Sequence, residues 1–452
     1  MNGSNINQIE VNYPVGEIRA NGFAMWPVLR IYLGDKLLFD KDRRVKIAAI
    51  NKKLFIKSLL FGLFPIFKKA DYLVFSVNSQ RRILNGFMVD RFDYLTEKLS
   101  NCLFAESPSP LHSKRSQIPT KNIMSKSWFH VFEMMISVFF RPRWKGNDIL
   151  HQILQESGQQ LEYRSIAKRY LAQYKIMKFL IKHKKIKALF LITSYTNMGY
   201  VKACRDSSIP VVEMQHGVIN ASHYAYNVAV DIDAHNYPDY LLTWGNFEKH
   251  IFSEKNFFIQ QDNVYPVGHF YLDYINSRNN TDEVLQQKLS GYKLTLAFTA
   301  QDAFEEKVLP LIIELAQRKP EWAIVYIPRR KTEDQYPTLP CNIIFASHLN
   351  CYQIIAQTDW HITVSSTCAL EAPAIGKPNV LLNFENRSQL FFGATFSGKT
   401  HTRFVRDIDE LITSLENDFI PNRSTIIDES NELFAADFKN NVINFISQVF
   451  HK

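Results

Sequence analysis

The sequence predicts an α/β protein with two doubly wound domains that face each other across a cleft, preceded by a helical leader. From residue 187 onward, short apolar runs typical of strands alternate with segments of helical spacing. This alternation occurs in two consecutive regions, each long enough to form a domain, which is typical of parallel sheets covered by helices. The length of 452 residues agrees with two or three domains.

The predicted elements of the first half begin with a strand and two long helices. In chain order they are a strand at 72–77, helices at 128–140 and 164–187, a strand at 188–195, a helix at 197–208, and strands at 211–215, 239–245 and 263–268. The strand, helix and strand over 188–215 form a βαβ unit of about 30 residues, which implies parallel strands.

The second half repeats this pattern. Its strands are predicted at 293–300, 322–328, 342–346, 360–366 and 379–384, and its helices at 303–319, 350–357, 367–376, 407–416 and 431–450. Ligands of such sheets bind at the carboxyl ends of the strands, so residues that follow strands are the candidates for chemistry.

Composition excludes several classes of protein. Hydrophobic residues make up 46% and charged residues 21%, and there are only 16 glycines, so a disordered or collagen-like chain is excluded. Five scattered cysteines without CxxC spacing indicate neither a disulfide scaffold nor a zinc site. The N-terminus lacks a secretory signal pattern, and no apolar run of about 18 residues occurs, so we expect a cytoplasmic protein without a transmembrane helix.

The net charge of +9 is concentrated in the first half. Residues 41–71 are rich in Lys and Arg and surround the apolar, aromatic segment 54–67, and a second such segment, 128–140, is followed by cations. Two interpretations remain open: insertion at an anionic membrane surface, or core helices with a solvated charged face. The basic helix 164–187 also suits nucleic acid, but no nucleic-acid-binding motif accompanies it, and we expect no such partner.

The strongest local motif is VSSTCALEAPAIGKP, residues 364–378. Ser365, Ser366 and Thr367 lie between a strand and a helix, with Ser366 as the expected N-cap. Backbone N–H groups at a helix start attract anions, and these hydroxyls would add donors for a phosphate. Glu371 in the second turn could reach the hydroxyls of a sugar. The alternative is an ordinary capped helix.

The second motif is EMQHG, residues 213–217. Glycine permits a sharp exit from the strand, which leaves His216 at the carboxyl edge of the sheet with Glu213 behind it. Two titratable groups at this edge are candidates for general acid or base chemistry. The alternative is a structural histidine bonded to the backbone.

Weaker candidates follow other predicted strands of the second half. Arg329 and Arg330, with Lys331, could hold a diphosphate, or they could form a solvated loop. The remaining candidates are Thr299, Gln301 and His348. No GxGxxG or GxSxG motif occurs, which argues against the enzymes that use them.

The pairing of QHG (215–217) with SSTCALEAPAIGKP (365–378) resembles bacterial glycosyltransferases of the GT-B fold, over roughly residues 188–385. The similar groups build capsule, lipopolysaccharide O-antigen and teichoic acid, and include sialyltransferase-like, Kdo-transferase-like and CDP-glycerol glycerophosphotransferase-like enzymes.

The resemblance implies roles for individual residues. Ser365, Ser366 and Thr367 would hold the donor phosphate, and Glu371 the ribose. Several of these groups have a His-Pro pair after a strand, where this chain has Pro328 followed by two arginines. Arg329 and Arg330, or His348, would therefore neutralise the leaving phosphate. No DxD motif is evident in the usual place, which fits metal-independent transfer, so we expect no metal or other cofactor.

The resemblance also implies a division into Rossmann-like domains. The expected parts are a leader at 1–70, an acceptor domain at 71–275, a nucleotide-donor domain at 290–430 and a C-terminal helix at 431–452.

The resulting hypothesis is a transferase that moves a sugar from a nucleotide-activated donor to a lipid-linked or growing surface polysaccharide, at the inner face of the cytoplasmic membrane. Glu213 or His216 would act as the base toward the acceptor hydroxyl, with Asp90 in reserve. The alternatives are a CDP-activated polyol-phosphate transferase and a non-catalytic GT-B-like scaffold of a polysaccharide assembly complex.

Overall fold

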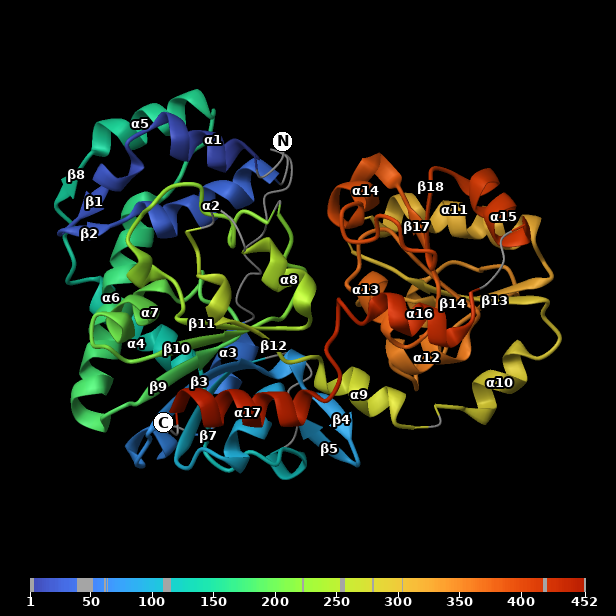
Figure 1. Cartoon of the computed structure of the whole chain (residues 1–452), viewed down its shortest axis with the longest axis horizontal. Coiled ribbons are helices and arrows are strands. Elements are labelled where there is room, and N and C mark those ends of the chain that lie inside the picture. The colour runs from blue at the N-terminus through green and yellow to red at the C-terminus, as the bar shows by residue number, and fades with distance from the viewer. Residues whose placement is uncertain are drawn as a thin grey trace. The chain divides into compact units, whose positions relative to one another are not determined.

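The structure is a computed structural model of the whole chain (Figure 1). It describes residues 4–38, 52–60, 62, 64–108, 115–221, 223–252, 257–278, 280–302, 304–417 and 421–450. The chain divides into two compact units. Unit 1 comprises Met1–Trp244, Glu248–Val267 and Lys439–Lys452, and unit 2 comprises Gly245–Phe247 and Gly268–Phe438.

Unit 1 is built on a parallel sheet of seven strands, in the order β12-β11-β10-β9-β3-β6-β7. In chain order these strands are β3 (Tyr72–Val77), β6 (Cys102–Ser107), β7 (Ile123–Ser125), β9 (Ala188–Leu191), β10 (Val211–Met214), β11 (Tyr240–Thr243) and β12 (Val264–Pro266). Both faces of the central strands are apolar, as expected for a parallel sheet covered by helices on both sides.

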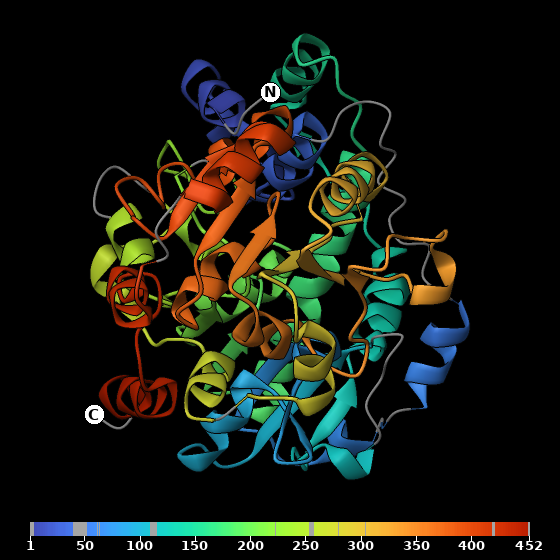
Figure 2. The same ribbon diagram turned by 90° about the vertical axis from the view of Figure 1, so that its right-hand side faces the viewer.

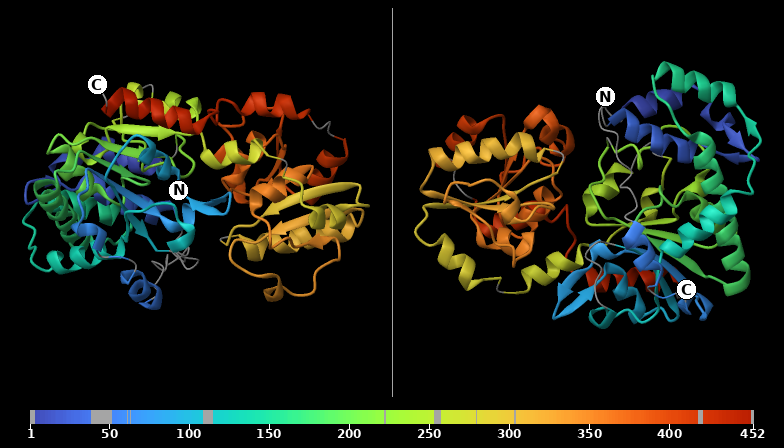
Figure 3. Two further views of the ribbon diagram at one scale, coloured as in Figure 1. Left: turned by 90° about the horizontal axis from the view of Figure 1, so that it is seen from below. Right: turned by 180° about the vertical axis from the view of Figure 1, so that it is seen from behind.

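Helices cover both faces of this sheet (Figures 1 and 3). One face packs on α4 (Ser127–Ser137), α6 (Tyr163–Lys184) and α7 (Met198–Arg205), through a core that contains Phe75, Phe129 and Tyr200. The other face carries Tyr72, Phe190, Tyr240 and Tyr265, whose rings contact Phe445 and Phe450 of α17 (Phe438–Phe450). The last helix of the chain therefore returns to the first unit.

The N-terminal segment forms small helices and a hairpin. Its elements are α1 (Ser4–Asn12), β1 (Arg19–Ala20), β2 (Phe23–Ala24), α2 (Trp26–Leu38) and α3 (Lys52–Leu59). Asn21 and Gly22 both have positive φ, which permits the tight turn between β1 and β2. β1 also pairs with β8 (Trp144–Lys145), next to α5 (Asn147–Glu156). A second hairpin joins β4 (Arg82–Leu84) to β5 (Phe87–Val89) through Asn85 and Gly86.

Unit 2 has a six-stranded parallel sheet in the order β15-β14-β13-β16-β17-β18. Its strands are β13 (Leu294–Thr299), β14 (Trp322–Ile327), β15 (Ile343–Ile344), β16 (Trp360–Thr363), β17 (Asn379–Leu382) and β18 (Thr402–Val405). Its helices are α9 (Phe270–Asn276), α10 (Glu283–Leu289), α11 (Glu305–Arg318), α12 (Cys351–Gln357), α13 (Cys368–Ala374), α14 (Arg387–Phe392), α15 (Ile408–Asn417) and α16 (Arg423–Ser430), and α8 (Asn246–Ile251) begins in it.

The core of unit 2 follows the strand alternation. Alternate residues of the strands, such as Leu296 and Ile324, pack with Ile312 of α11 and Leu411 of α15. Helices flank this sheet as well (Figure 2). Two parallel sheets with flanking helices confirm the predicted fold class of two Rossmann-like domains.

One predicted element differs clearly from the structure. The segment 431–450 was expected to be a single helix, but α17 begins only at Phe438, after Asp437 with a φ of 67°. A residue in the left-handed conformation interrupts the hydrogen-bond ladder of a helix. The helix therefore does not extend through Asp437, although the apolar spacing is helical on both sides of it. Within the described residues, no helix is both long and apolar enough to cross a bilayer.

Candidate functional site

Each sheet has one position where the strand order reverses direction. In unit 1 the chain builds outward from β3 to β7 on one side and from β9 to β12 on the other, so the reversal lies between β3 and β9. In unit 2 it lies between β13 and β16. Ligands of open parallel sheets bind outside the carboxyl ends of the strands at such a point. These two positions are therefore the candidate sites.

In unit 1 the carboxylate of Glu213, on β10, lies beside the carboxyl end of β9. It is fully buried, and it accepts hydrogen bonds from the Ser194 N–H at 3.1 Å and the Tyr226 hydroxyl at 2.6 Å. Burial raises the pKa of Glu213 to about 7, against the opposing effect of these hydrogen bonds. A base with this pKa would be effective near neutral pH, but the enclosed carboxylate can act only through its neighbours in this conformation.

His216 lies past the end of β10 and is half-buried. Its Nε2 atom is 3.4 Å from the Tyr195 hydroxyl, and its Nδ1 atom is buried without a hydrogen-bond partner. Burial lowers the pKa of His216 to about 3, and the positive charge of Arg91 adds to the shift. The imidazole is thus neutral at pH 7 and has one nitrogen able to accept a proton.

Aromatic rings join these two residues into one cluster. Tyr195 packs edge to face on Tyr226, and His223 packs edge to face on the same ring at 5.0 Å. We call Tyr195, Glu213, His216, His223 and Tyr226 the His216 cluster. The sequence pointed to Glu213 and His216 as candidates, and it placed Tyr195 at the end of the predicted strand 188–195 without assigning it a role.

Gln215 fixes the backbone that presents His216. Its side-chain amide donates to Glu248 at 2.7 Å, and its side-chain oxygen accepts from the Trp244 N–H at 2.6 Å. The guanidinium of Arg91 donates to the backbone carbonyl of Gln215. In the QHG motif, Gln215 therefore anchors the backbone, and His216 lies beyond the end of the strand.

Asp90 lies outside the His216 cluster. It is fully buried and caps a short 3-10 helix by accepting from the Phe92 N–H at 2.8 Å. Burial raises the pKa of Asp90 to about 6, although Arg81 opposes the shift. Its charged neighbours are Arg81, Asp93 and Arg91, and its assignment as a reserve base remains a prediction.

In unit 2 the structure brings Gln301 and Ser365 together at the strand reversal. The side-chain oxygen of Gln301, after β13, accepts from the Ser365 N–H at 2.8 Å and lies 3.0 Å from the Ser365 hydroxyl, after β16. Thr299 is buried nearby, and its hydroxyl lies 2.9 Å from Nε2 of His361. Three predicted residues, from the ends of two strands, therefore occupy one edge of the sheet.

Ser366 and Thr367 continue from this edge into α13 and are half-buried. The helix begins at Cys368 with Thr367 as its flanking residue, one position later than the expected N-cap. Ser366 still contributes to the helix start, since its hydroxyl accepts from the Cys368 N–H at 3.3 Å. Glu371 is buried and accepts from the Tyr352 hydroxyl at 2.8 Å.

The predicted cations are at the surface of unit 2. Arg329 and Arg330 are exposed, and Arg330 pairs with Asp302 at 2.8 Å. His348 is exposed and lies 3.1 Å from Asp282 at the start of α10. Their proposed contact with a leaving phosphate remains a prediction, and exposed side chains of this length can change rotamer at little cost.

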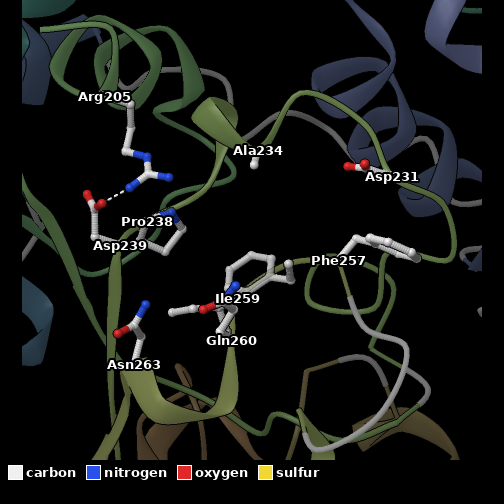
Figure 4. A pocket seen from close by; sticks show the side chains of 10 residues that line it. Arg205, Asp231, Ala234, Pro238, Asp239, Phe257, Ile259, Gln260 and Asn263 are labelled. Atoms are coloured by element: carbon white, nitrogen blue, oxygen red, sulfur yellow. Dashed lines mark ion pairs between the residues drawn. The ribbon is translucent and has the colours of Figure 1, made fainter. Parts of the chain in front are cut away.

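The described residues contain no group of three or more His, Cys, Asp and Glu side chains placed to hold a metal ion. A cavity of about 450 Å³ lies in unit 1, lined by residues such as Phe257, Gln260 and Asn263 and by the ion pair of Arg205 with Asp239 (Figure 4). Most of its lining residues precede β11 and β12, at the amino-terminal ends of these strands, and Phe258 of the lining packs on Tyr226 of the His216 cluster at 5.1 Å.

Comparisons with known proteins identify the fold. No protein-family model matches the chain, and no curated protein matches it. Among solved structures, a kitacinnamycin glycotransferase matches with a TM-score of 0.51 and 11% identity, over 84% of this chain and 99% of the other. A UDP-GlcNAc 2-epimerase from Neisseria meningitidis bound to UDP-GlcNAc gives 0.47 and 13%, over 83% and 99%. The wall teichoic acid polymerase TagF gives 0.47 and 11%, over 84% and 88%. The chain thus has a GT-B-like fold.

Proposed function

We propose that the chain is a glycosyltransferase that moves a sugar from a nucleotide-activated donor to a lipid-linked or growing bacterial surface polysaccharide. The observation that carries the proposal is the position of the polar residues at the strand reversals of both sheets, in a GT-B-like fold. Unit 1 has a neutral imidazole beyond the end of β10, and unit 2 has the hydroxyls of Ser365, Ser366 and Thr367 beyond the end of β16, each at the carboxyl edge of its own sheet.

In the proposed reaction, an acceptor hydroxyl attacks the anomeric carbon of the donor. The bond from that carbon to the phosphate oxygen breaks, and its electron pair remains on the nucleotide. His216 takes the acceptor proton, while Glu213 holds Tyr226 and the backbone of Ser194 in place. Hydroxyl and backbone donors around Ser365 would stabilise the departing phosphate.

The first test is a thermal-shift screen of the purified chain against UDP, GDP, CDP, CMP and dTDP. A ligand that binds only the folded state raises its apparent stability, by about 2.7 kcal/mol at a hundred times its Kd. We expect one nucleotide to raise the Tm, and Ser365→Ala and Ser366→Ala to remove most of this shift. Ser290→Ala, an exposed serine of the same unit, is the matched control.

For a diphosphate-activated donor, the released nucleotide then identifies the reaction. Sugar transfer leaves both phosphates on a diphosphate donor nucleotide, whereas a polyol-phosphate transferase releases CMP from a CDP-activated donor. A nucleotide that binds without any turnover would instead support the non-catalytic scaffold. If no nucleotide changes the Tm at millimolar concentration, the proposed donor site is wrong.

A further inference from the structure

Exposed apolar side chains of unit 1 are concentrated on the neighbouring α3 and α4 segments, with one more on α6. Of the sixteen large apolar residues exposed in the described part of the chain, nine lie on α3, just after it, on or just after α4, and on α6. We call these nine the α3–α4 apolar surface: Ile56, Leu60, Phe64, Phe67, Met134, Met135, Val138, Phe139 and Phe179. The five most exposed, at 74–85%, all belong to it. Such concentration in one region is typical of an interaction surface.

Hydrogen bonds hold the two segments side by side. The indole N–H of Trp128, at the start of α4, donates to the Leu59 carbonyl at the end of α3 at 3.0 Å. The hydroxyls of Ser58 and Ser127 lie 2.7 Å apart. Met134, Met135, Val138 and Phe139 share one helical face by their spacing, while Phe129 packs inward on Phe75. Both sides of α4 are therefore apolar, although only one contributes to the core.

The exposed charge beside this surface is positive, and the bordering acids Asp71 and Glu133 are buried and paired with Lys69 and Arg169. Residues 54–70, 134–145 and 164–187 contain no Asp or Glu. Lys57, Lys68 and Lys69 are exposed beside the α3 segment, and Lys184 of α6 donates to the Lys68 carbonyl at 2.6 Å. The exposed cations directly after α4 are Arg141, Arg143 and Lys145.

We propose that the α3–α4 apolar surface inserts into the headgroup region of an anionic lipid bilayer. Aromatic and aliphatic side chains surrounded by lysine and arginine complement a negatively charged interface with an apolar interior. α4 has 11 residues and is about 16 Å long, too short to span the bilayer core, so the contact is superficial. The inference deepens the proposed function, because it names the surface on which a lipid-linked acceptor would be met.

Vesicle flotation of the full chain tests this proposal without any sugar transfer. The vesicles contain phosphatidylcholine alone or phosphatidylcholine with phosphatidylglycerol. We expect the wild type to float with the anionic vesicles only. The paired changes Phe64→Ser with Phe67→Ser, and Val138→Ser with Phe139→Ser, should each weaken partitioning by about tenfold or more. Lys68→Gln with Lys69→Gln should weaken it about fivefold per lysine at low salt, and less at high salt.

The matched control is Ile83→Ser with Phe87→Ser, two exposed apolar residues of the β4–β5 hairpin in the same unit. It should float like the wild type, and circular dichroism should show that every variant is folded. The proposal is overturned if the wild type does not float, if it floats equally with neutral vesicles, or if the apolar variants float unchanged. It is also overturned if sedimentation shows a dimer that these variants dissociate, because a second copy would then cover the surface. A failed donor screen leaves the flotation result unaffected.

Discussion

Glu213 is a buried carboxyl group whose proton affinity depends on folding. Its folded-state pKa near 7 lies above the ordinary value of 4.5, so the folded chain holds the proton more tightly than the unfolded chain. The free energy of unfolding is therefore raised below pH 4.5 and falls by up to about 3 kcal/mol as the pH rises through 7. Glu213→Gln should remove this dependence. Urea unfolding across pH 4.5–8 measures it.

The control is Glu283→Gln, which removes an exposed carboxylate. This variant should keep the wild-type dependence of the free energy of unfolding on pH. Equal pH profiles for the wild type and Glu213→Gln would show that the Glu213 carboxyl does not titrate in this range.

His216 is the base in the proposed reaction. We expect His216→Gln to lower turnover about a hundredfold or more, because general bases contribute factors of this size. Nucleotide binding should be unchanged, since the predicted donor residues lie in the other sheet. Initial rates and thermal shifts on the same preparation measure both quantities. His235→Gln, an exposed histidine paired with Asp206, should retain full activity. A His216→Gln enzyme with wild-type turnover would refute the role as base.

At the scale of elements, a buried ion pair fastens the N-terminal helices to the loop that follows β10. Arg30 of α2 and Glu10 of α1 are both fully enclosed, and Arg30 also donates to the backbone carbonyls of Tyr224 and Asn227. Arg30→Met should destabilise unit 1 by about 3–5 kcal/mol, since it leaves the Glu10 charge buried without its partner. Chemical denaturation measures this cost.

Hydrogen exchange in residues 218–228 should rise in the same Arg30→Met variant, because the loop loses two of its anchors. Arg318→Gln removes exposed ion pairs with Glu314 and Asp409 and should cost less than about 1 kcal/mol. Equal costs for the two substitutions would mean that Arg30 does not anchor the loop.

The elements differ in how well the sequence predicts them. The strands at the centre of each sheet are continuous apolar runs, so the predicted strands 72–77, 293–300 and 360–366 correspond to β3, β13 and β16. The hairpin of β4 and β5 was missed, although its Asn85-Gly86 turn is a recognised hairpin signal. β6 was also missed, because polar loops surround it in the sequence. The basic residues at 41–51 and the side chains of Lys52 and Lys53 lie outside the described residues.

At the scale of the whole molecule, each unit has buried cores of its own. Leu189 belongs to a core of unit 1, and Leu315 to a core of unit 2. We expect calorimetry to show more than one transition, since chains with several domains often depart from two-state unfolding. Leu189→Ala and Leu315→Ala should each lower a different transition, at a cost of about 2–5 kcal/mol.

The nucleotide found by the screen should raise only the transition that Leu315→Ala lowers. A single transition that both substitutions shift equally would show that the two units unfold together, and this prediction would then be wrong.

The sequence by itself determined the local elements and the residue types at the strand ends. Apolar periodicity identified the alternating strands and helices, and glycine and serine marked where the QHG and SST motifs leave their strands. These signals are local, because each depends on neighbours within one or two turns of chain.

Only the tertiary structure decided which of these residues meet. Gln301 and Ser365 are 64 positions apart and are joined by the pairing of β13 with β16. Burial, and with it the raised pKa of Glu213 and the lowered pKa of His216, depends on side chains contributed by distant segments. The same holds for the α3–α4 apolar surface. A helix face is apolar by its sequence, but whether it contacts the core or remains exposed depends on what packs against it.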